Sequence, residues 1–339
     1  MTSPVLPYPD APVLVGIDAG ATKAVAIAVT PDGERIARAE GPGANPKRHG
    51  LEDAADRIVA LAHEVAKDRL RAEVHESAKD RLRAEVHESA KDRRPAAAHE
   101  PVPDRTPALL FVAGAGIDRP EHARALRAAL EARLPATRII VVNDTLAVLR
   151  AGTLDAVGLA VPVSTGGNVI GRGPDGRVTD RGHGIFGGAY ALGALAARAA
   201  LSDRVGQDLR RTVAAAGLRW TGRRPGPEAA LLGAAVARAA EAGDPVPARM
   251  VDRWCARVTE AVDEEVDRLG LGPEPAVVVY GGLLEASAWL GDRIRQAILA
   301  ASPGARLVSL ATEPAEGAAL LALDAWRGTP VAWDFTPRR

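Results

Sequence analysis

The sequence predicts an α/β protein made of two lobes that repeat one arrangement of strands. Residues 13–43 read VLVGIDAGATKAVAIAVTPDGERIARAEGPG, and residues 156–184 read AVGLAVPVSTGGNVIGRGPDGRVTDRGHG. Each segment contains an apolar strand, a Gly/Thr turn, a second strand, a Pro-Asp-Gly reversal and a third strand, and Asp-Gly pairs between apolar runs typically mark reversals. The length of 339 residues also exceeds the size at which a single core stops growing. We therefore expect one lobe in each half of the chain.

The turn of the first repeat carries residues suited to phosphate. Asp18 follows the apolar run 13–17 and so emerges at a strand end. Its carboxylate suits Mg²⁺, which prefers one or two carboxylates together with water and phosphate oxygens. Gly20 permits the close backbone approach that a turn around phosphate requires. Thr22 adds hydroxyl and amide donors, and Lys23 adds a positive charge that can face polyphosphate.

The turn of the second repeat has the donors of an anion site but no carboxylate. Its residues 164–168 read STGGN and offer amide and hydroxyl hydrogens. For either turn alone, an ordinary hairpin with glycine at positive φ is an equally good interpretation. Because the turns occupy matching positions of a repeated unit, we favour two lobes that grip a nucleotide between them, and hence a phosphoryl-transfer enzyme.

Composition excludes several other classes of function. The formal net charge is zero, from 43 basic and 43 acidic residues, so nothing attracts the chain generally to nucleic acid or to a membrane surface. One cysteine, Cys255, excludes an intrachain disulfide and a cysteine-ligated metal cluster. The start of the chain lacks the pattern of a signal peptide, and no apolar run is long enough to span a bilayer. We expect a soluble protein of the cytoplasm.

A tandem duplication interrupts the first half. The sequence AKDRLRAEVHES occurs at 66–77 and again at 78–89, and a third copy begins at Ala90. Its residues favour helix, but a 12-residue period turns each copy by about 120° around the helix axis, so the copies share no apolar face. We interpret residues from about 66 to 94 as a solvent-exposed extension of a helix that begins at Leu51.

The first lobe then continues with a strand, an amphipathic helix and a strand that ends at Asn143 and Asp144. Open α/β sheets bind ligands beyond the carboxyl ends of their strands, so Asp144 is a candidate base that accepts the proton of an attacking hydroxyl. It could equally serve only as the N-cap of the next helix. The segments are 108–117, 121–134 and 138–145.

The second lobe continues with Ala-rich helices, a long amphipathic helix, a strand that leads to Gly281-Gly282, and a final strand and small-residue helix. The two glycines leave room for a flat base against the backbone, although a strand-to-helix turn with positive φ would need glycine as well. The predicted helices lie at 188–201, 228–241, 249–270 and 313–326.

Five motifs, in this order and spacing, resemble the BadF/BadG/BcrA/BcrD-type ATPase and N-acetylglucosamine kinase family. They are GIDAGATK, VVNDT, VSTGGN, VVYGG and EPAEGAALLAL. The resemblance implies the superfamily of sugar kinases, actin and heat-shock chaperones, with a duplicated ribonuclease-H-like fold and a nucleotide cleft between the lobes. The implied lobes are 1–150 and 151–312, and residues 313–339 form a connector helix that returns to the first lobe.

The resemblance further implies a kinase that uses ATP and Mg²⁺ to phosphorylate an amino sugar, such as N-acetylglucosamine or glucosamine, at carbon 6. Asp144 would be the catalytic base and Asp18 the metal ligand. The ATP-binding residues would be Gly20, Thr22, Lys23, Thr165, Gly166, Gly281 and Gly282. The sugar-binding residues would be Asn45, Asn143 and Asn168. A homodimer is also implied.

One departure leaves the substrate open. The hexosamine kinases of this family carry Gly-Asp-Glu-Gly-Ser after the second hairpin, whereas residues 184–190 here read GIFGGAY, without either acid. A different sugar or a cyclitol is therefore an alternative, with Tyr190 or His183 lining the pocket.

Two other functions stay open. One is an ATPase that activates a partner, which would need cysteines for an iron–sulfur cluster, and the other is a non-catalytic nucleotide-binding regulator.

Overall fold

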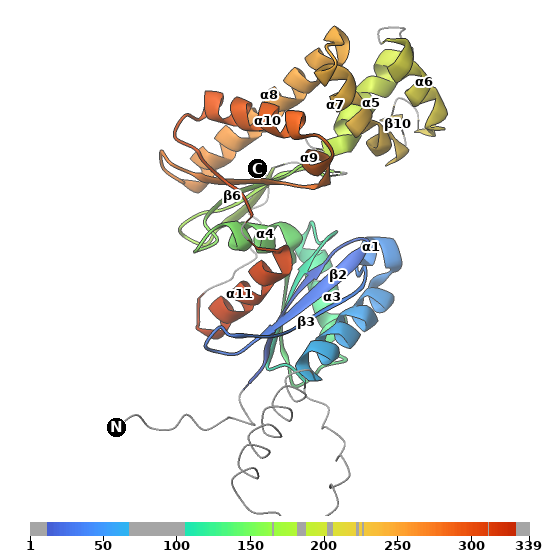
Figure 1. Ribbon diagram of the computed structural model, residues 1–339. Helices are drawn as coiled ribbons and strands as arrows, with labels where there is room; N and C mark the ends of the chain where they lie inside the picture. The colour runs from blue at the N-terminus through green and yellow to red at the C-terminus, as the bar shows by residue number, and fades with distance from the viewer. Residues whose placement is uncertain are drawn as a thin grey trace, which may run out of the picture. The chain divides into compact units, whose positions relative to one another are not determined.

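In the computed structural model, the described residues are 12–67, 106–164, 166–181, 188–201, 206–221, 224–225, 227–310 and 312–329. The chain divides into two compact units. The first contains the chain up to Ala147 together with the segment from Pro314, and the second contains Val148–Glu313. The division falls inside the helix that follows Asn143, and Figure 1 shows the elements of both units.

The first unit is built on a five-stranded sheet with the order β3-β2-β1-β4-β5. The strands are β1 Leu14–Ala19, β2 Lys23–Val29, β3 Arg35–Pro42, β4 Leu109–Gly114 and β5 Arg138–Asn143. The first three strands form an antiparallel meander. β4 pairs with β1 in parallel, and β5 pairs with β4 in parallel. Because β1, β4 and β5 are parallel, their carboxyl ends share one edge of the sheet.

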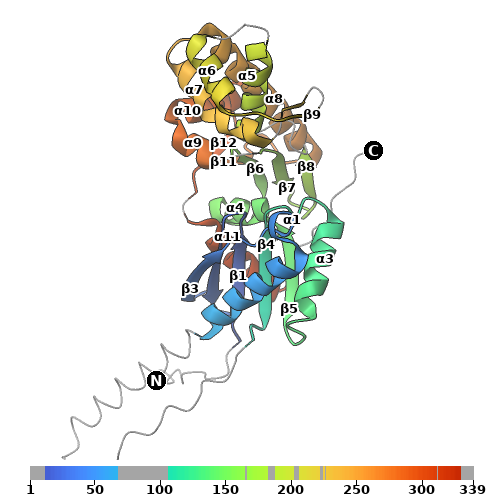
Figure 2. The same cartoon turned by 90° about the vertical axis from the view of Figure 1, so that its right-hand side faces the viewer.

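Helices cover both faces of this sheet. Residues 51–67 and α3 (Pro120–Glu131) lie on one face, and α11 (Pro314–Trp326) lies on the other (Figures 1 and 2). Gly16 of β1 lets α11 approach closely, because a Cβ atom there would lie 2.1 Å from the amide nitrogen of Ala319. The short α1 (Pro46–His49) precedes residue 51, and α4 (Asp144–Gly152) follows β5.

The second unit repeats the topology of the first. Its sheet has the order β12-β11-β6-β7-β8, again with an antiparallel meander of three strands extended in parallel by two. The strands are β6 Gly158–Pro162, β7 Val169–Arg172, β8 Val178–Arg181, β11 Ala276–Tyr280 and β12 Arg306–Val308. The predicted duplication of one α/β unit is therefore confirmed.

Helices pack on the second sheet around a core that includes the buried Trp254 and Cys255. They are α5 Gly188–Leu201, α6 Gln207–Ala215, α7 Gly233–Glu241, α8 Pro245–Leu269, α9 Gly282–Ala286 and α10 Ala288–Ala301. The predicted helix 228–241 begins instead as a 3₁₀ segment, Pro227–Leu232, and the predicted helix 249–270 begins earlier, at Pro245. The side chain of Asp244 accepts a hydrogen bond from the amide of Val246 at 3.0 Å, so α8 starts at this cap.

A two-stranded ribbon, β9 (Trp220–Thr221) with β10 (Arg224–Pro225), also belongs to this unit. In the first unit, residues 51–67 are helical as predicted, whereas the duplicated extension from residue 68 onward lies outside the described residues. Among the helices that are described, none combines the length and the apolar character needed to cross a membrane.

Candidate active site

The first glycine turn joins β1 to β2, and the end of β3 braces it. The amide of Ala44 donates to the carbonyl of Gly20 at 3.0 Å, and the amide of Gly43 donates to the carbonyl of Thr22 at 3.1 Å. A Cβ atom on Gly20 would lie 2.6 Å from the carbonyl oxygen of Lys23, so the turn requires glycine there. The bracing leaves Thr22 exposed, and Asp18 is half-buried in β1.

The side chain of Lys23 is already paired in the structure. Its Nζ lies 3.7 Å from a carboxylate oxygen of Glu40 on β3, and both side chains are largely exposed. Arg38 donates to the same oxygen of Glu40 at 3.2 Å. Sequence reasoning missed Glu40, which stands two residues before Pro42, the strand partner of Lys23. A polyphosphate at this turn would therefore compete with Glu40 for the ammonium group.

Asn143 and Asp144 lie where β5 ends and α4 begins, and their side chains do different things. The Oδ1 atom of Asn143 accepts a hydrogen bond from the amide of Thr145 at 2.9 Å, which is the geometry of an N-cap. The Nδ2 atom of Asn143 donates to the carbonyl of Ile117 at 3.1 Å. Asn143 therefore provides the N-cap of α4. Capping alone does not explain why position 144 is an aspartate.

The carboxyl group of Asp144 is poorly solvated. Burial, and next the negative charge of Asp118, raise its pKa from 3.8 to about 6, while hydrogen bonds from Thr145 and from its own backbone act in the opposite direction. A carboxylate with this pKa is mostly ionised at neutral pH and holds a proton more tightly than an ordinary aspartate. Both properties suit a general base.

The loop after β4 connects these residues to Asn45. Asn45 caps α1 by accepting from the amide of Lys47 at 2.9 Å. Gly116 has a φ of +84°, and a Cβ atom there would lie 2.6 Å from the Oδ1 atom of Asn45. The same loop accepts the hydrogen bond from Asn143 at Ile117. The first unit therefore gathers Asn45, Asn143 and Asp144 around one loop.

That loop also contains Asp118, which sequence reasoning missed together with Lys47. The two side chains form an ion pair, and each is partly exposed. A signal for Asp118 was present in the sequence, because it follows the buried strand β4 at the same sheet edge as Asp144.

The second glycine turn follows β6 and lies against two other glycines. A Cβ atom on Gly188, where φ is +76°, would lie 2.2 Å from the carbonyl of Ser164 and 2.3 Å from that of Gly166. A Cβ atom on Gly281, where φ is +127°, would lie 2.5 Å from the carbonyl of Val163. The start of α5 thus lies against the second glycine turn, and the end of β11 lies against Val163, which precedes that turn.

The remaining predicted residues of the second unit vary in their surroundings. Gly282 begins α9, and a Cβ atom there would meet nothing within 4 Å, so the space beside it is open. Asn168 is half-buried just before β7. The hydroxyl of Tyr190 donates to the carbonyl of Pro225 at 2.9 Å, which ties α5 to the β9–β10 ribbon. Thr165, His183 and the segment 184–187 lie outside the described residues.

Among the predicted site residues, the metal ligand expected from the sequence is Asp18. Within the described ranges, no group of three or more His, Cys, Asp or Glu side chains is arranged to hold a metal. Mg²⁺ usually keeps several waters and binds one or two carboxylates together with substrate phosphates, so Asp18 beside a turn of backbone donors is a sufficient protein contribution. Gly166 has nothing within 4 Å of a Cβ position, which leaves room for an anion at the second turn.

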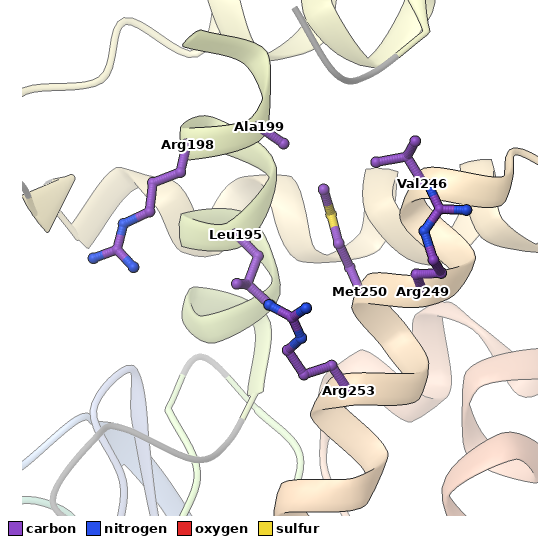
Figure 3. Close-up of a pocket in the computed structure, with 7 residues that line it drawn as sticks. All are labelled: Leu195, Arg198, Ala199, Val246, Arg249, Met250 and Arg253. Carbon is purple, nitrogen blue, oxygen red and sulfur yellow. The ribbon is translucent and has the colours of Figure 1, made fainter. Parts of the chain in front are cut away.

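A separate cavity of about 680 Å³ lies between α5 and α8 in the second unit. Figure 3 shows Arg253 reaching toward Leu195, whereas Arg198 points away from the other lining residues. Met250 and Val246 give the cavity an apolar side. None of the glycine-motif residues within the described ranges lines it.

Two sheets of one topology, each with a glycine turn after its first strand, define an actin-like ATPase fold. The model of the BadF/BadG/BcrA/BcrD ATPase family matches residues 15–322, and this chain belongs to that family. The family expected from the order of the motifs is therefore confirmed. No curated protein matches the chain.

Several solved structures share the fold. A candidate N-acetylglucosamine kinase from Chromobacterium violaceum has a TM-score of 0.61 at 21% identity, covering 93% of this chain and 100% of the other. A candidate N-acetylglucosamine kinase from Porphyromonas gingivalis has a TM-score of 0.56 at 18% identity, covering 92% and 99%. A ROK hexokinase from Thermus thermophilus has a TM-score of 0.55 at 17% identity, covering 91% and 98%. At these identities the likeness establishes the fold.

Proposed function

We propose that the protein is an ATP-dependent sugar kinase that transfers the γ-phosphate of ATP to a hydroxyl group, at carbon 6, of an amino sugar such as N-acetylglucosamine or glucosamine. The observation that carries the proposal is the position of Asp144 at the carboxyl edge of the first sheet, where burial raises the pKa of its carboxyl group to about 6. The ATPase family supports the use of ATP. The names of three similar structures, two N-acetylglucosamine kinase candidates and a hexokinase, support a sugar as the acceptor.

In the proposed reaction Asp144 accepts the proton of the sugar hydroxyl as the oxygen attacks the γ-phosphorus of ATP, and the bond from that phosphorus to the β–γ bridging oxygen breaks, so that ADP leaves. Asn45, which packs on Gly116, and Asn143, which donates to the carbonyl of Ile117, would orient the sugar, and Asn168 would hold a further hydroxyl or acetamido group. ATP would supply the phosphoryl group, and a bound Mg²⁺ would offset part of the developing negative charge. Asp18 would hold the metal.

The phosphates would be held by backbone and side-chain donors of the two turns. Gly20, Thr22 and Lys23 belong to the first turn, and Thr165 and Gly166 to the second. Binding at the first turn would draw the ammonium of Lys23 from Glu40 toward phosphate, an exchange between two anions that costs little at an exposed site. Gly281 and Gly282 would flank the adenosine, where Gly282 borders open space.

The alternative of an ATPase that activates a partner through an iron–sulfur cluster gains no support. Cys255, the one cysteine in the sequence, is buried in α8. Burial raises the pKa of its thiol to about 12, and a cluster ligand must be a thiolate. A cytoplasmic location and a homodimeric state remain expectations from the sequence and its resemblance.

The experiment that tests the function is ADP release from Mg-ATP in the presence of single sugars. The panel is N-acetylglucosamine, glucosamine, N-acetylmannosamine, glucose and several cyclitols, with ATP binding measured separately by calorimetry. Stimulation by an amino sugar supports the proposal and names the substrate. ATP turnover that no sugar changes would point to an ATPase, and ATP binding without turnover would point to a regulator.

A further inference from the structure

Three consecutive carbonyl groups of the first glycine turn each accept a hydrogen bond from residues 43–49. The carbonyls of Gly20 and Thr22 accept from backbone amides. The carbonyl between them, that of Ala21, lies 3.1 Å from the Nε2 atom of His49 on α1. Because a carbonyl oxygen can only accept, the Nε2 atom carries the hydrogen of this bond. The histidine side chain therefore completes the bracing of the turn.

The contact between His49 and Ala21 does not serve α1 itself. The two residues stand 28 positions apart in the chain. The end of α1 is closed by a backbone bond, because the amide of Gly50 donates to the carbonyl of Pro46 at 3.0 Å. The ring of His49, which is half-buried, contacts the glycine turn instead.

The segment that supports the turn is fixed from its other side as well. The guanidinium of Arg57 donates to the carbonyl of Gly43 at 2.7 Å and lies 2.7 Å from a carboxylate oxygen of Asp53. A Cβ atom on Gly43 would lie 2.4 Å from the carbonyl oxygen of Ala21, so the segment and the turn pack without room for a side chain there. The support is thus itself held in place by the helix that follows it.

The bracing separates the acceptors of the turn from its donors. In the part of the chain that the structure describes, no loop hydrogen bond starts from the amide of Gly20, Ala21 or Thr22. A bound phosphate needs amide donors of this kind and is repelled by carbonyl oxygens that face it. Carbonyl groups that are engaged with residues 43–49 are not free to rotate toward the phosphate. The support therefore keeps the turn in a conformation that suits an anion.

We propose that His49 is a positioning residue for the phosphates of ATP, which acts through the carbonyl of Ala21 to hold the first glycine turn in this conformation. The inference rests on the proposed function, because it takes the turn to bind those phosphates. The bonds to Gly20 and Thr22 come from the backbone, so a side-chain substitution does not remove them. Replacement of His49 is therefore the direct way to test the support.

The test separates the hydrogen bond of His49 from the packing of its ring. His49→Phe keeps a ring and removes the N–H donor, whereas His49→Gln keeps a side-chain N–H donor and removes the ring. The full chain is titrated calorimetrically with AMP-PNP and Mg²⁺, without sugar. His49→Phe is expected to lower the affinity by about 3–10-fold, the contribution of one hydrogen bond, and His49→Gln is expected to stay near the unmodified protein.

The control is the same substitution at His63, another half-buried histidine of the first unit. Its Nδ1 atom has no hydrogen-bond partner among the described residues, so His63→Phe is expected to leave nucleotide affinity unchanged. Thermal unfolding of each variant reports stability separately. If His49→Phe does not fold, His49→Met, which has the length of glutamine without its N–H donor, is compared with His49→Gln.

Two results would overturn the inference. A histidine with only a structural role would give a lower Tm in both His49 variants without any change in affinity. A greater loss of affinity in His49→Gln than in His49→Phe would assign the effect to the ring and not to the hydrogen bond.

Sugar-dependent turnover distinguishes a failure of this inference from a failure of the proposed function. With an active sugar, His49→Phe is expected to raise the KM for ATP and to leave the KM for the sugar unchanged. Equal nucleotide affinity in all variants with normal turnover would overturn the role of His49 and leave the function standing. If no sugar stimulates turnover but the affinities differ as expected, the function falls and the role of His49 is retained. Absence of nucleotide binding by the unmodified protein would overturn both.

Discussion

At the scale of single residues, the neighbouring residues Asn143 and Asp144 have different roles in the site. Asn143 caps α4 and fixes the loop after β4, so Asp144 is not needed for either task. Its carboxyl group stays in a poorly solvated position that costs stability when the group is charged. Such a cost is expected where function, and not folding, selects the residue.

Asp144→Asn is expected to lower sugar-dependent turnover by about 10²–10⁴-fold, the usual contribution of a general base. The affinity for Mg-ATP is expected to change little, because the proposed nucleotide residues are elsewhere. Steady-state kinetics and calorimetry on the same preparation check both statements. Phosphorylation of the sugar at the normal rate by this variant would remove Asp144 from the mechanism.

The same substitution is expected to stabilise the protein above neutral pH. A carboxyl group whose pKa is raised on folding contributes stability that is present below pH 3.8 and is lost as the pH rises through about 6. The neutral side-chain amide of asparagine avoids this loss of stability. A pKa difference of this size corresponds to a loss of at most about 3 kcal/mol. Thermal unfolding at pH 8 is expected to show a higher Tm for Asp144→Asn than for the unmodified protein, and the gain is expected to shrink toward pH 4.

At the scale of elements, the neighbouring residues Gly281 and Gly282 illustrate two different reasons for a glycine at a strand-to-helix turn. Gly281 has a φ of +127° and no room for a Cβ atom, so Gly281→Ala is expected to destabilise the second unit by about 1–3 kcal/mol. Gly282→Ala adds a methyl group to open space and is expected to leave stability nearly unchanged. Urea denaturation of the two variants measures the difference.

If adenosine lies beside Gly282, Gly282→Ala is expected to weaken ATP binding, since its methyl group would occupy part of that space. Calorimetric titration with Mg-ATP gives the affinity, and the preserved stability of the variant excludes misfolding as the cause. Unchanged affinity would argue that the nucleotide base lies elsewhere.

Most elements could be predicted from local sequence, and much of the site could not. Alternating and continuous apolar runs gave the strands and their order, because burial on one or both faces leaves a periodic trace. The start of α8 was placed too late because the cap at Asp244 precedes two prolines, Pro245 and Pro247, which resemble a loop. Lys47 and Asp118 could not be paired in advance, because a contact across 71 positions has no local pattern.

At the scale of the whole molecule, α11, which lies near the end of the described chain, packs against β1, its first strand. Gly16→Ala would place a methyl group 2.1 Å from the backbone of α11, and overpacking of this kind typically costs about 1–3 kcal/mol. The control is Gly41→Ala on β3, where the nearest atom would lie at an ordinary 3.5 Å. Urea denaturation, with hydrogen exchange to locate the loss in the first unit, is expected to show a large effect for Gly16 and a small one for Gly41.

The position of α11 also has a consequence for synthesis on the ribosome. The first unit draws its residues from both sides of the second, so its last helix, from Pro314 to Trp326, is made only after the second unit is complete. Domains generally fold as units while the chain grows at about 5–20 residues per second. The continuous segment Val148–Glu313 can therefore fold first, while the earlier-made strands keep the β1 face uncovered, in reach of chaperones, until the final helix emerges.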